Sequence, residues 1–141
     1  MPNFEVHEAA VARNQKVLDC LLEHDEHSPS DFAHWVITVA FYKALHLVEA
    51  AFSREKRSFH SADHYERNQR LKSIKKYEHI WKHYRPLFEE SLVARYLVAS
   101  NSETNFNTYL SGSSVRTTFI DHHLRQIENS CATMKADAEK G

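Results

Sequence analysis

An arginine and a histidine near the C-terminal end of the chain have the types and spacing needed for acid–base chemistry on a phosphate. Arg116 and His123 interrupt an apolar stripe made of Phe119, Ile120, Ile127, Cys131 and Met134. On an α-helix, residues seven apart differ by about 20° around the axis and lie about 10 Å apart along it, so both would face one surface. A guanidinium can then stabilise a phosphate while an imidazole moves a proton. His122 points about 120° away from Arg116, and the competing interpretation is a hydrogen-bonded pair of core or interface residues.

A second set of polar residues lies within the most apolar stretch of the chain, residues 31–52. Five of them fall within roughly 120° of each other on a helix: His34, Thr38, Tyr42, His46 and Glu49. A helix that is otherwise apolar nearly all round is typical of the buried centre of a bundle. Its polar stripe must therefore face polar partners, a cleft or a second subunit. Arg95 interrupts the apolar stripe of a later helix, and Glu49 is its predicted carboxylate partner.

The chain contains eleven histidines, which raises the question of a metal site. His79 and His83 lie opposite the apolar stripe of their helix and are predicted to be solvated. His60 and His64 could join His46 in a three-histidine site between helices. No histidine follows a glutamate by three residues and no HExxH motif occurs, which disfavours a di-iron carboxylate bundle. Neither a metal nor a cofactor is therefore expected.

The composition favours an all-helical protein. Among 141 residues there are two glycines and three prolines, too few for the turns of a β-sandwich or barrel. The length suits one domain over residues 1–141, with a polar tail from about 135. Cys20 and Cys131 are too few for a disulfide framework, so two reduced thiols in the cytoplasm are expected. The acidic and polar N-terminal residues predict that no signal peptide precedes the domain, and charges in the apolar stretch argue against a membrane span or any membrane contact.

The apolar periodicity predicts an up-and-down bundle of four long helices and one short helix. The long helices are expected over about 5–24, 31–52, 73–99 and 113–134, and the short helix within 60–72. Pro86 disfavours helical geometry at Arg85, which predicts a kink or a break there. The polar stretch 100–114 is long enough to be a functional loop.

Small polar residues before three of these helices are candidate caps. Ser30 or Asp31 would cap the central helix, and Ser61 would cap the short helix. Ser113 or Ser114 would cap the last helix. Each would supply a side-chain oxygen to backbone N–H groups that lack an intrahelical acceptor.

Residues 54–85 are strongly basic in a chain whose net charge is −1. They hold ten Lys/Arg and four Asp/Glu, a net charge of +6. The rest of the chain holds 8 basic and 15 acidic residues, a net charge of −7. Aromatic residues are interleaved with these charges, as on many RNA-binding surfaces, although a solvated charged face is the simpler interpretation. Within this segment His64, Arg67 and Asn68 share one face of the predicted short helix.

Three stretches together resemble the HEPN superfamily of small helical bundles: FYKALHLVEAAF, HSADHYERN and SLVARYL. The resemblance covers about residues 30–130. It implies an up-and-down bundle of four long helices that is often dimeric. Many members are metal-independent ribonucleases of toxin–antitoxin, phage-defence or CRISPR systems, and others are non-catalytic. Active members carry an arginine, four to six residues and then a histidine near the start of the last long helix, and pair two copies across a dimer.

The positions that match this motif are Arg116 followed by His122, with five residues between, or by His123, with six. By this resemblance Arg116 would stabilise the scissile phosphate and His123 would be the general acid or base. The residue after the arginine is often asparagine in the family and is Thr117 here. The chain is therefore expected to be a homodimeric RNA-binding protein with metal-independent endoribonuclease activity, in a toxin–antitoxin or defence setting where an antitoxin is a further partner.

Two alternatives from other classes stay open. One is a non-catalytic bundle that binds a protein or a nucleotide through the polar stripe. The predicted binding residues are His46, Glu49, His64, Arg67, Asn68 and Arg95. The other alternative is the metal-dependent bundle that would use the three-histidine site.

Overall fold

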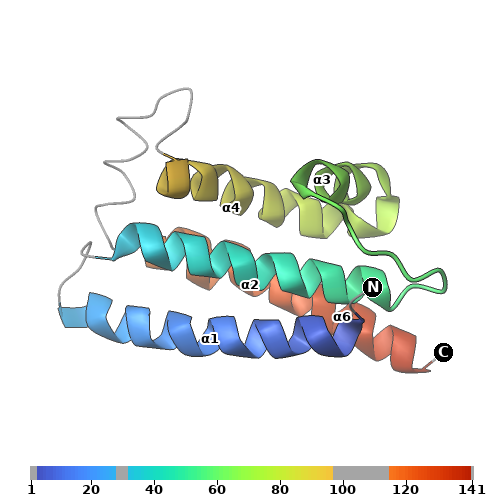
Figure 1. Ribbon diagram of the computed structural model, residues 1–141, viewed down its shortest axis with the longest axis horizontal. Coiled ribbons are helices and arrows are strands. Elements are labelled where there is room, and N and C mark those ends of the chain that lie inside the picture. Colours follow the sequence, from blue (N-terminus) through green and yellow to red (C-terminus); the bar gives the residue numbers. More distant parts are fainter. Residues whose placement is uncertain (1–2, 28–31, 97–114, 141) are drawn as a thin grey trace.

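The computed structural model describes residues 3–27, 32–96 and 115–140, and every regular element among them is helical. The prediction of an all-helical bundle is therefore confirmed for these residues. The elements, drawn in Figure 1, are α1 Phe4–His27, α2 Ala33–Ser53, α3 His64–Ser73, η1 Lys75–Tyr77, α4 Glu78–Tyr96, η2 Val115–Leu124 and α6 Arg125–Lys140. The proposed caps Ser30, Asp31, Ser113 and Ser114 and the stretch 100–114 lie outside the described residues.

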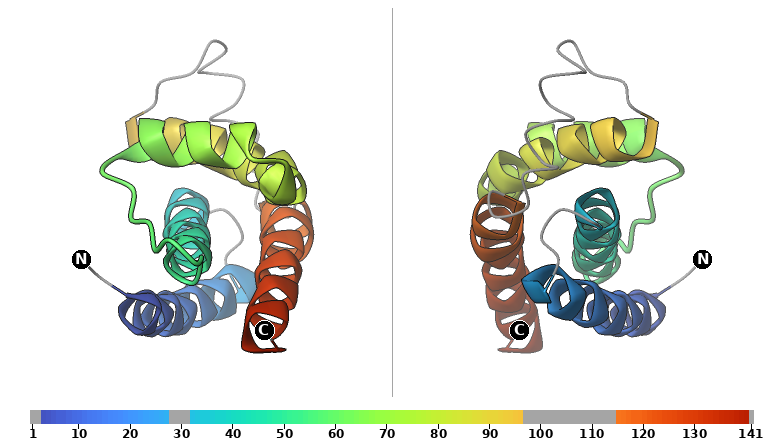
Figure 2. Two further views of the ribbon diagram at one scale, coloured as in Figure 1. Left: turned by 90° about the vertical axis from the view of Figure 1, so that its right-hand side faces the viewer. Right: turned by 90° about the vertical axis from the view of Figure 1, so that its left-hand side faces the viewer.

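Helix α2 is the centre of the bundle, as predicted. It packs against α1, α4, η2 and α6, whereas α3 packs against α4. Figure 2 shows the other long helices grouped around α2, and in Figure 1 successive long helices run in alternating directions. The side chains of α2 that are at most 1% exposed are Ala33, Val36, Ile37, Ala40, Phe41, Ala44, Val48, Glu49 and Phe52. Helix α2 therefore supplies the largest share of the buried apolar side chains among the described helices.

By length and composition α2 is also the one described helix that could cross a membrane. In this structure 72% of the most apolar 18-residue stretch of α2 is buried inside the bundle. Core helices of soluble proteins give the same signal, because both environments select apolar side chains.

Helix α3 begins at a different cap from the one predicted. Asp63 is the N-cap, and its carboxylate accepts from the Glu66 N–H at 2.8 Å. Glu66 in turn accepts from the Ala62 N–H at 3.1 Å, so two N–H groups that the helix leaves unpaired are satisfied. The prediction that Ser61 caps this helix was wrong, because Ser61 bonds to Glu49 of α2 instead.

The predicted helix over 73–99 is divided at its start and not at Pro86. The short turn η1 precedes α4, and α4 continues through Pro86 without interruption. A proline inside a helix removes one N–H and crowds the preceding turn. Tyr84 and Leu87 on either side are fully buried in the core, and this packing keeps the segment helical.

The last helical segment starts as a π-helix. Residues of η2 form i→i+5 hydrogen bonds, and α6 follows it directly. A π-helix has a wider turn than an α-helix, so residues seven apart no longer share a face. The α-helical spacing that placed Arg116 and His123 on one surface therefore does not apply here.

Candidate functional site

A buried carboxylate lies at the centre of the polar stripe of α2. Glu49 is 1% exposed and accepts three hydrogen bonds. The Ser61 N–H donates to Oε1 at 2.8 Å, the Ser61 hydroxyl donates to Oε2 at 2.6 Å, and the Arg67 Nε donates to Oε2 at 3.0 Å. A buried charge needs this compensation, and Arg67 supplies the opposite charge. The expectation that the stripe faces polar partners is confirmed at Glu49.

Four histidines surround this ion pair, and each comes from a different segment. They are His7 of α1, His46 of α2, His60 of the connection 54–63 and His64 of α3. In Figure 2 this connection returns from the end of α2 to the start of α3 along the side of α2 away from α6. We call Glu49, Ser61, Arg67 and these four histidines the Glu49 centre.

Arg67 fixes the protonation of its nearest histidine. Its Nη1 lies 3.0 Å from Nδ1 of His64. A guanidinium only donates hydrogen bonds, so this Nδ1 accepts and carries no proton. Burial, followed by the positive charges of Arg67 and Arg95, lowers the pKa of His64 below its usual value. His64 is therefore a neutral imidazole.

The other three histidines form a chain that reaches Glu49. Nδ1 of His7 lies 3.1 Å from Nδ1 of His46, the rings of His7 and His60 stack at 5.2 Å, and Nε2 of His60 lies 3.9 Å from Glu49 Oε1. Burial, then the charges of His7 and Arg67, lowers the pKa of His46 to about 4. His60 has 31% of its side chain exposed, His46 is also partly exposed, and His7 is buried.

Arg95 does not pair with Glu49, so that prediction was wrong. Its guanidinium bonds to the Tyr42 hydroxyl at 3.2 Å and to the carbonyl and hydroxyl oxygens of Ser91 at 3.2 and 3.1 Å. It also lies over the Phe41 ring at 5.2 Å from the ring centroid. Arg95 is only partly buried, so neutral acceptors and aromatic faces are enough to hold its charge. Tyr42 of the stripe thus has a polar partner as well.

Asn68, the remaining predicted binding residue, lies beside Arg67 on α3. Its Oδ1 is buried and has no hydrogen-bond partner among the residues that the structure describes. A buried amide oxygen without a donor is costly, and in native structures such a group calls for an explanation such as a bound water or ligand.

A second group of histidines joins α4 to η2. His79 and His83 come from α4, and His122 and His123 come from η2. Nδ1 of His83 lies 3.0 Å from Nδ1 of His123, and the His83 and His122 rings are 5.1 Å apart. The His79 and His83 rings are 5.0 Å apart. We call these four residues the histidine quartet.

The prediction that His83 is solvated was wrong. It is 5% exposed because η2 covers the side of α4 that its own apolar stripe leaves open. Burial, then the neighbouring histidines, lowers the pKa of His83 to about 4. Burial and His122 also lower the pKa of His123. His79 is exposed, as predicted, and its Nδ1 lies 2.7 Å from the Ser130 hydroxyl.

Arg116 and His123 lie against different helices. Arg116 lines a groove together with Gln15 and Asp19 of α1, whereas His123 contacts His83 of α4. The π-helical turn explains this divergence. The rings of His122 and His123 both lie next to the ring of His83, at 5.1 and 5.3 Å between ring centroids.

Two sets of side chains in the described part of the chain have metal-ligand geometry. Three possible ligand atoms lie within 4.8 Å of one another in His83, His122 and His123, and likewise in His7, Glu49 and His60. The predicted set of His46, His60 and His64 is neither of these, since Nδ1 of His64 is occupied by Arg67.

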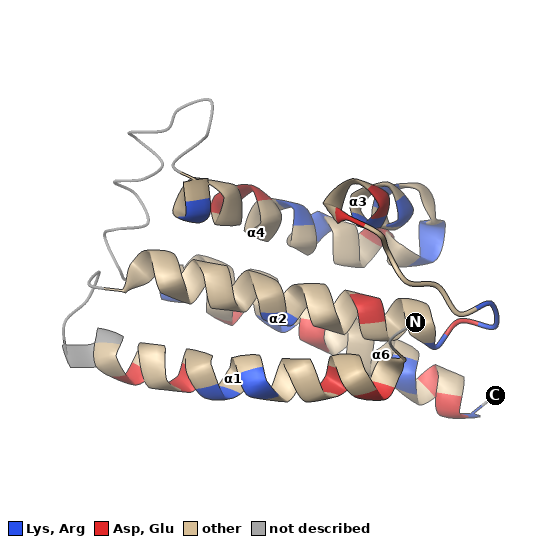
Figure 3. Cartoon of the chain, viewed as in Figure 1, with Lys and Arg blue, Asp and Glu red and all other residues tan. Residues whose placement is uncertain are grey.

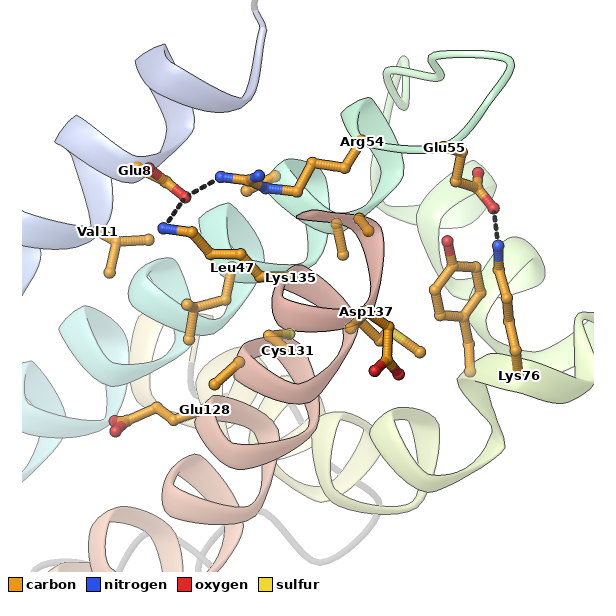
Figure 4. Close-up of a pocket in the computed structure, with 16 residues that line it drawn as sticks. Glu8, Val11, Leu47, Arg54, Glu55, Lys76, Glu128, Cys131, Lys135 and Asp137 are labelled. Carbon is orange, nitrogen blue, oxygen red and sulfur yellow. Dashed lines mark hydrogen bonds and ion pairs between the residues drawn. The ribbon is translucent and has the colours of Figure 1, made fainter. Parts of the chain in front are cut away.

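A pocket of about 570 Å³ opens between α1, α2, η1 and α6 (Figure 4). Its apolar lining includes Val11, Leu47, Ala50, Ala51, Cys131, Ala132, Met134 and Ala138. Ion pairs lie at its rim: Glu8 binds Arg54 and Lys135, and Glu55 binds Lys76. Burial raises the pKa of the Cys131 thiol to about 12, so this sulfur is not a nucleophile.

The basic segment 54–85 is partly neutralised by acidic residues from other parts of the chain. Arg54 pairs with Glu8 and Arg67 with Glu49. Within the described residues, five exposed cations of the segment form no ion pair: Lys56, Arg57, Lys72, Lys75 and Lys82. The ribbon in Figure 3 shows the Lys and Arg positions of this segment on the connection before α3, on and just after α3, and along α4.

Comparison of the chain with protein-family models, curated proteins and solved structures gave no match.

Proposed function

We propose that this protein binds single-stranded RNA over the Glu49 centre and cleaves it without a metal ion. The observation that supports this most directly is the convergence of four histidines on the buried Glu49–Arg67 pair. Imidazoles are the side chains best suited to proton transfer near neutral pH. In such cleavage the RNA 2′-hydroxyl loses a proton to a base and attacks the adjacent phosphorus. The 5′-oxygen leaves with a proton from an acid.

The exposure of each group indicates its role. His60 is assigned the proton transfer to RNA, because 31% of its side chain is exposed and it lies on the connection that carries exposed cations. Neutral His46 is linked to it through His7. Arg67 has only 7% of its side chain exposed and is engaged by Glu49 and His64, so it is a positioning residue. Lys56 and Arg57 lie on the same connection as His60, are exposed, and would bind the phosphates.

The resemblance to the HEPN superfamily supplies the proposed setting. In that setting the protein acts in the cytoplasm as a homodimer, within a toxin–antitoxin or defence system, and an antitoxin restrains it. Light scattering at micromolar concentration should then give about twice the chain mass of 16.5 kDa. A monomer at that concentration would remove the dimer from the proposal.

The family motif offers a competing assignment of the catalytic residues. Arg116 and His123 lie against different helices within one chain, so they would have to act across a dimer. The Glu49 centre is complete within one chain. Substituting His60 and His123 separately therefore distinguishes the two sites.

The experiment is cleavage of a labelled single-stranded RNA with EDTA present, and the matched DNA serves as substrate control. The loss of a general acid or base lowers the rate of a reaction by about 10²–10⁴-fold. The rate of RNA cleavage by the His60→Ala variant should therefore be lower than that of the wild-type protein by this factor. His34→Ala is the matched control, because His34 lies on the same stripe of α2 outside the centre. Intact RNA with the wild-type protein would refute the cleavage. If the His123→Ala variant loses cleavage while the His60→Ala variant keeps full activity, the catalytic residues are those of the family motif and not those of the Glu49 centre.

A second candidate is a non-catalytic binding module, and the pocket favours it. Its mostly apolar lining and charged rim suit a ligand with an apolar body and a polar end. Ala51→Trp would fill the pocket from α2 without touching the Glu49 centre. RNA binding that survives Ala51→Trp but is lost in a Lys56→Ala/Arg57→Ala double variant would favour the RNA proposal over this one.

A further inference from the structure

The histidine quartet lies apart from the Glu49 centre, and the proposed cleavage does not use it. It brings together four imidazoles from two elements that are distant in sequence, α4 and η2. Within it, the ligand nitrogens of three residues lie within 4.8 Å of one another. Imidazole nitrogens are the commonest protein ligands of zinc and related ions.

The spacing of the two closest nitrogens suits a shared ion. Nδ1 of His83 and Nδ1 of His123 are 3.0 Å apart. Two ligands with bonds of 2.0–2.1 Å at a tetrahedral ion are separated by about 3.3 Å, so a small outward movement would admit a metal ion. Without an ion, one of the two rings must donate a proton to the other. With an ion, both nitrogens act as acceptors.

The π-helical turn makes the set possible. In an α-helix, consecutive residues such as His122 and His123 would point about 100° apart, and only one could face α4. In η2 both rings lie within 5.1–5.3 Å of the His83 ring. Stretches of π-helix are rare and frequently occur at functional sites.

Protonation does not compete with a metal ion at the buried member. Burial and the neighbouring histidines keep His83 neutral well below pH 7, and a neutral imidazole is the form that binds metal. The fourth member, His79, has its ring 5.0 Å from the His83 ring and has one of its nitrogens beside a hydroxyl. The Ser130 hydroxyl lies 2.7 Å from Nδ1 of His79, which leaves Nε2 of that ring for an ion.

The other three-residue set is a poorer cation site. In the Glu49 centre the carboxylate already accepts three hydrogen bonds, and one comes from the Arg67 guanidinium at 3.0 Å. A metal ion there would have to displace or approach that positive charge. The quartet contains no carboxylate and no arginine, so the same obstacle does not arise.

We propose that His83, His122 and His123, with His79 as the fourth ligand, bind one divalent transition-metal ion of the zinc class. An all-imidazole set suits Zn²⁺, Ni²⁺ or Cu²⁺ and does not suit Mg²⁺ or Ca²⁺, which prefer oxygen ligands. The ion joins α4 to η2 and so fastens the start of the last helical segment to the bundle. This role is separate from RNA cleavage.

The test is calorimetric titration of the metal-stripped protein with Zn²⁺, together with Co²⁺ absorption as a report of ligand geometry. The wild-type protein should bind one Zn²⁺ per chain, and Mg²⁺ should not compete. The double variant His122→Ala/His123→Ala should lose more than about 100-fold in affinity, because removing even a second-shell partner costs 10–100-fold. Ser130→Ala should lose about 10-fold, as expected for a positioning residue.

The matched control is His34→Ala/His60→Ala, which removes two histidines elsewhere, one of them from the Glu49 centre. It should keep wild-type affinity for Zn²⁺ within about threefold. If the double variant of the quartet is unfolded by circular dichroism, the single variant His122→Gln serves instead, since His122 is exposed. The proposal is overturned if wild-type protein shows no saturable Zn²⁺ binding at tens of micromolar. It is equally overturned if the quartet variants keep full affinity or the control loses as much as they do.

Discussion

The Glu49 centre and the histidine quartet are both clusters of imidazoles between helices, yet their charges are arranged differently. In the Glu49 centre a buried carboxylate faces a buried guanidinium, and the histidines surround this fixed pair. The quartet consists of four imidazoles with no fixed charge among them, and the Ser130 hydroxyl lies beside His79. Four histidines thus lie around a buried ion pair in one cluster and among neutral groups in the other.

This difference determines what each cluster can accept. The ion pair of the Glu49 centre is already neutralised and hydrogen-bonded, so the centre can position imidazoles but has little capacity for another cation. The quartet offers imidazole nitrogens close to one another and no cation among its members, which suits the proposed metal ion. Substitutions can test the comparison on both sides.

The largest expected effect is on stability at the Glu49 centre. Glu49→Ala would leave the Arg67 cation buried without its partner, which costs roughly 3–5 kcal/mol of the free energy of unfolding. Urea denaturation measures this loss. The control Glu89→Ala removes an exposed partner of Arg85 and should cost less than about 1 kcal/mol. A loss at Glu49 no larger than in the control would mean that the pair is not a buried charge pair.

The next effect is acid destabilisation, to which both clusters contribute. His46 and His83 have folded-state pKa values of about 4, against 6.5 for an unperturbed histidine. Between these values the unfolded chain binds protons that the folded protein does not bind, so stability rises with pH and is lost as pH falls from about 6.5 to 4. Urea midpoints across this range measure the slope. A flat or reversed profile would mean that the two imidazoles are not held neutral.

The sequence predicted the central helix and its polar stripe because burial follows a helical period that can be counted. It did not identify Arg67 as the partner of Glu49. The two residues are 18 apart and belong to different helices, and only the return of the connection 54–63 brings them together. His64, Arg67 and Asn68 were predicted to share a face, which was the available signal. The charge balance of segment 54–85 could not show which cation turns inward.

The histidine quartet was missed for a related reason. A helical wheel of α4 places His83 opposite the apolar stripe, yet the opposite side is covered by η2. The geometry of η2 was also not predictable, since the α-helical period was applied to a segment that forms i→i+5 hydrogen bonds. Spacing arguments were reliable where the helix type was the usual one and failed where it was not.

A smaller loss of stability is expected on substituting Arg95 than on substituting Arg67. Arg95→Met would remove hydrogen bonds to Tyr42 and Ser91, which are neutral acceptors, and should cost about 1 kcal/mol. Arg67→Met would strand the Glu49 carboxylate and should match the loss in Glu49→Ala. Urea denaturation of both variants in the same buffer gives the two free energies of unfolding to be compared. Equal losses would mean that Arg95 has a charged partner after all.

The smallest effect concerns the reactivity of the two cysteines. Cys20 lies on the outside of α1, and Cys131 lines the pocket. Cys20 is exposed, whereas Cys131 is buried and burial raises its pKa to about 12. The reactive species is the thiolate, so Cys20 should react with a thiol reagent in the native protein while Cys131 reacts only on unfolding. Counting modified thiols before and after adding urea measures this difference. Ala51→Trp, which fills the pocket, should leave the native count unchanged. Two thiols that react equally fast in the native protein would show that the pocket floor opens to solvent, and that the packing of α6 on α2 is looser than this structure indicates.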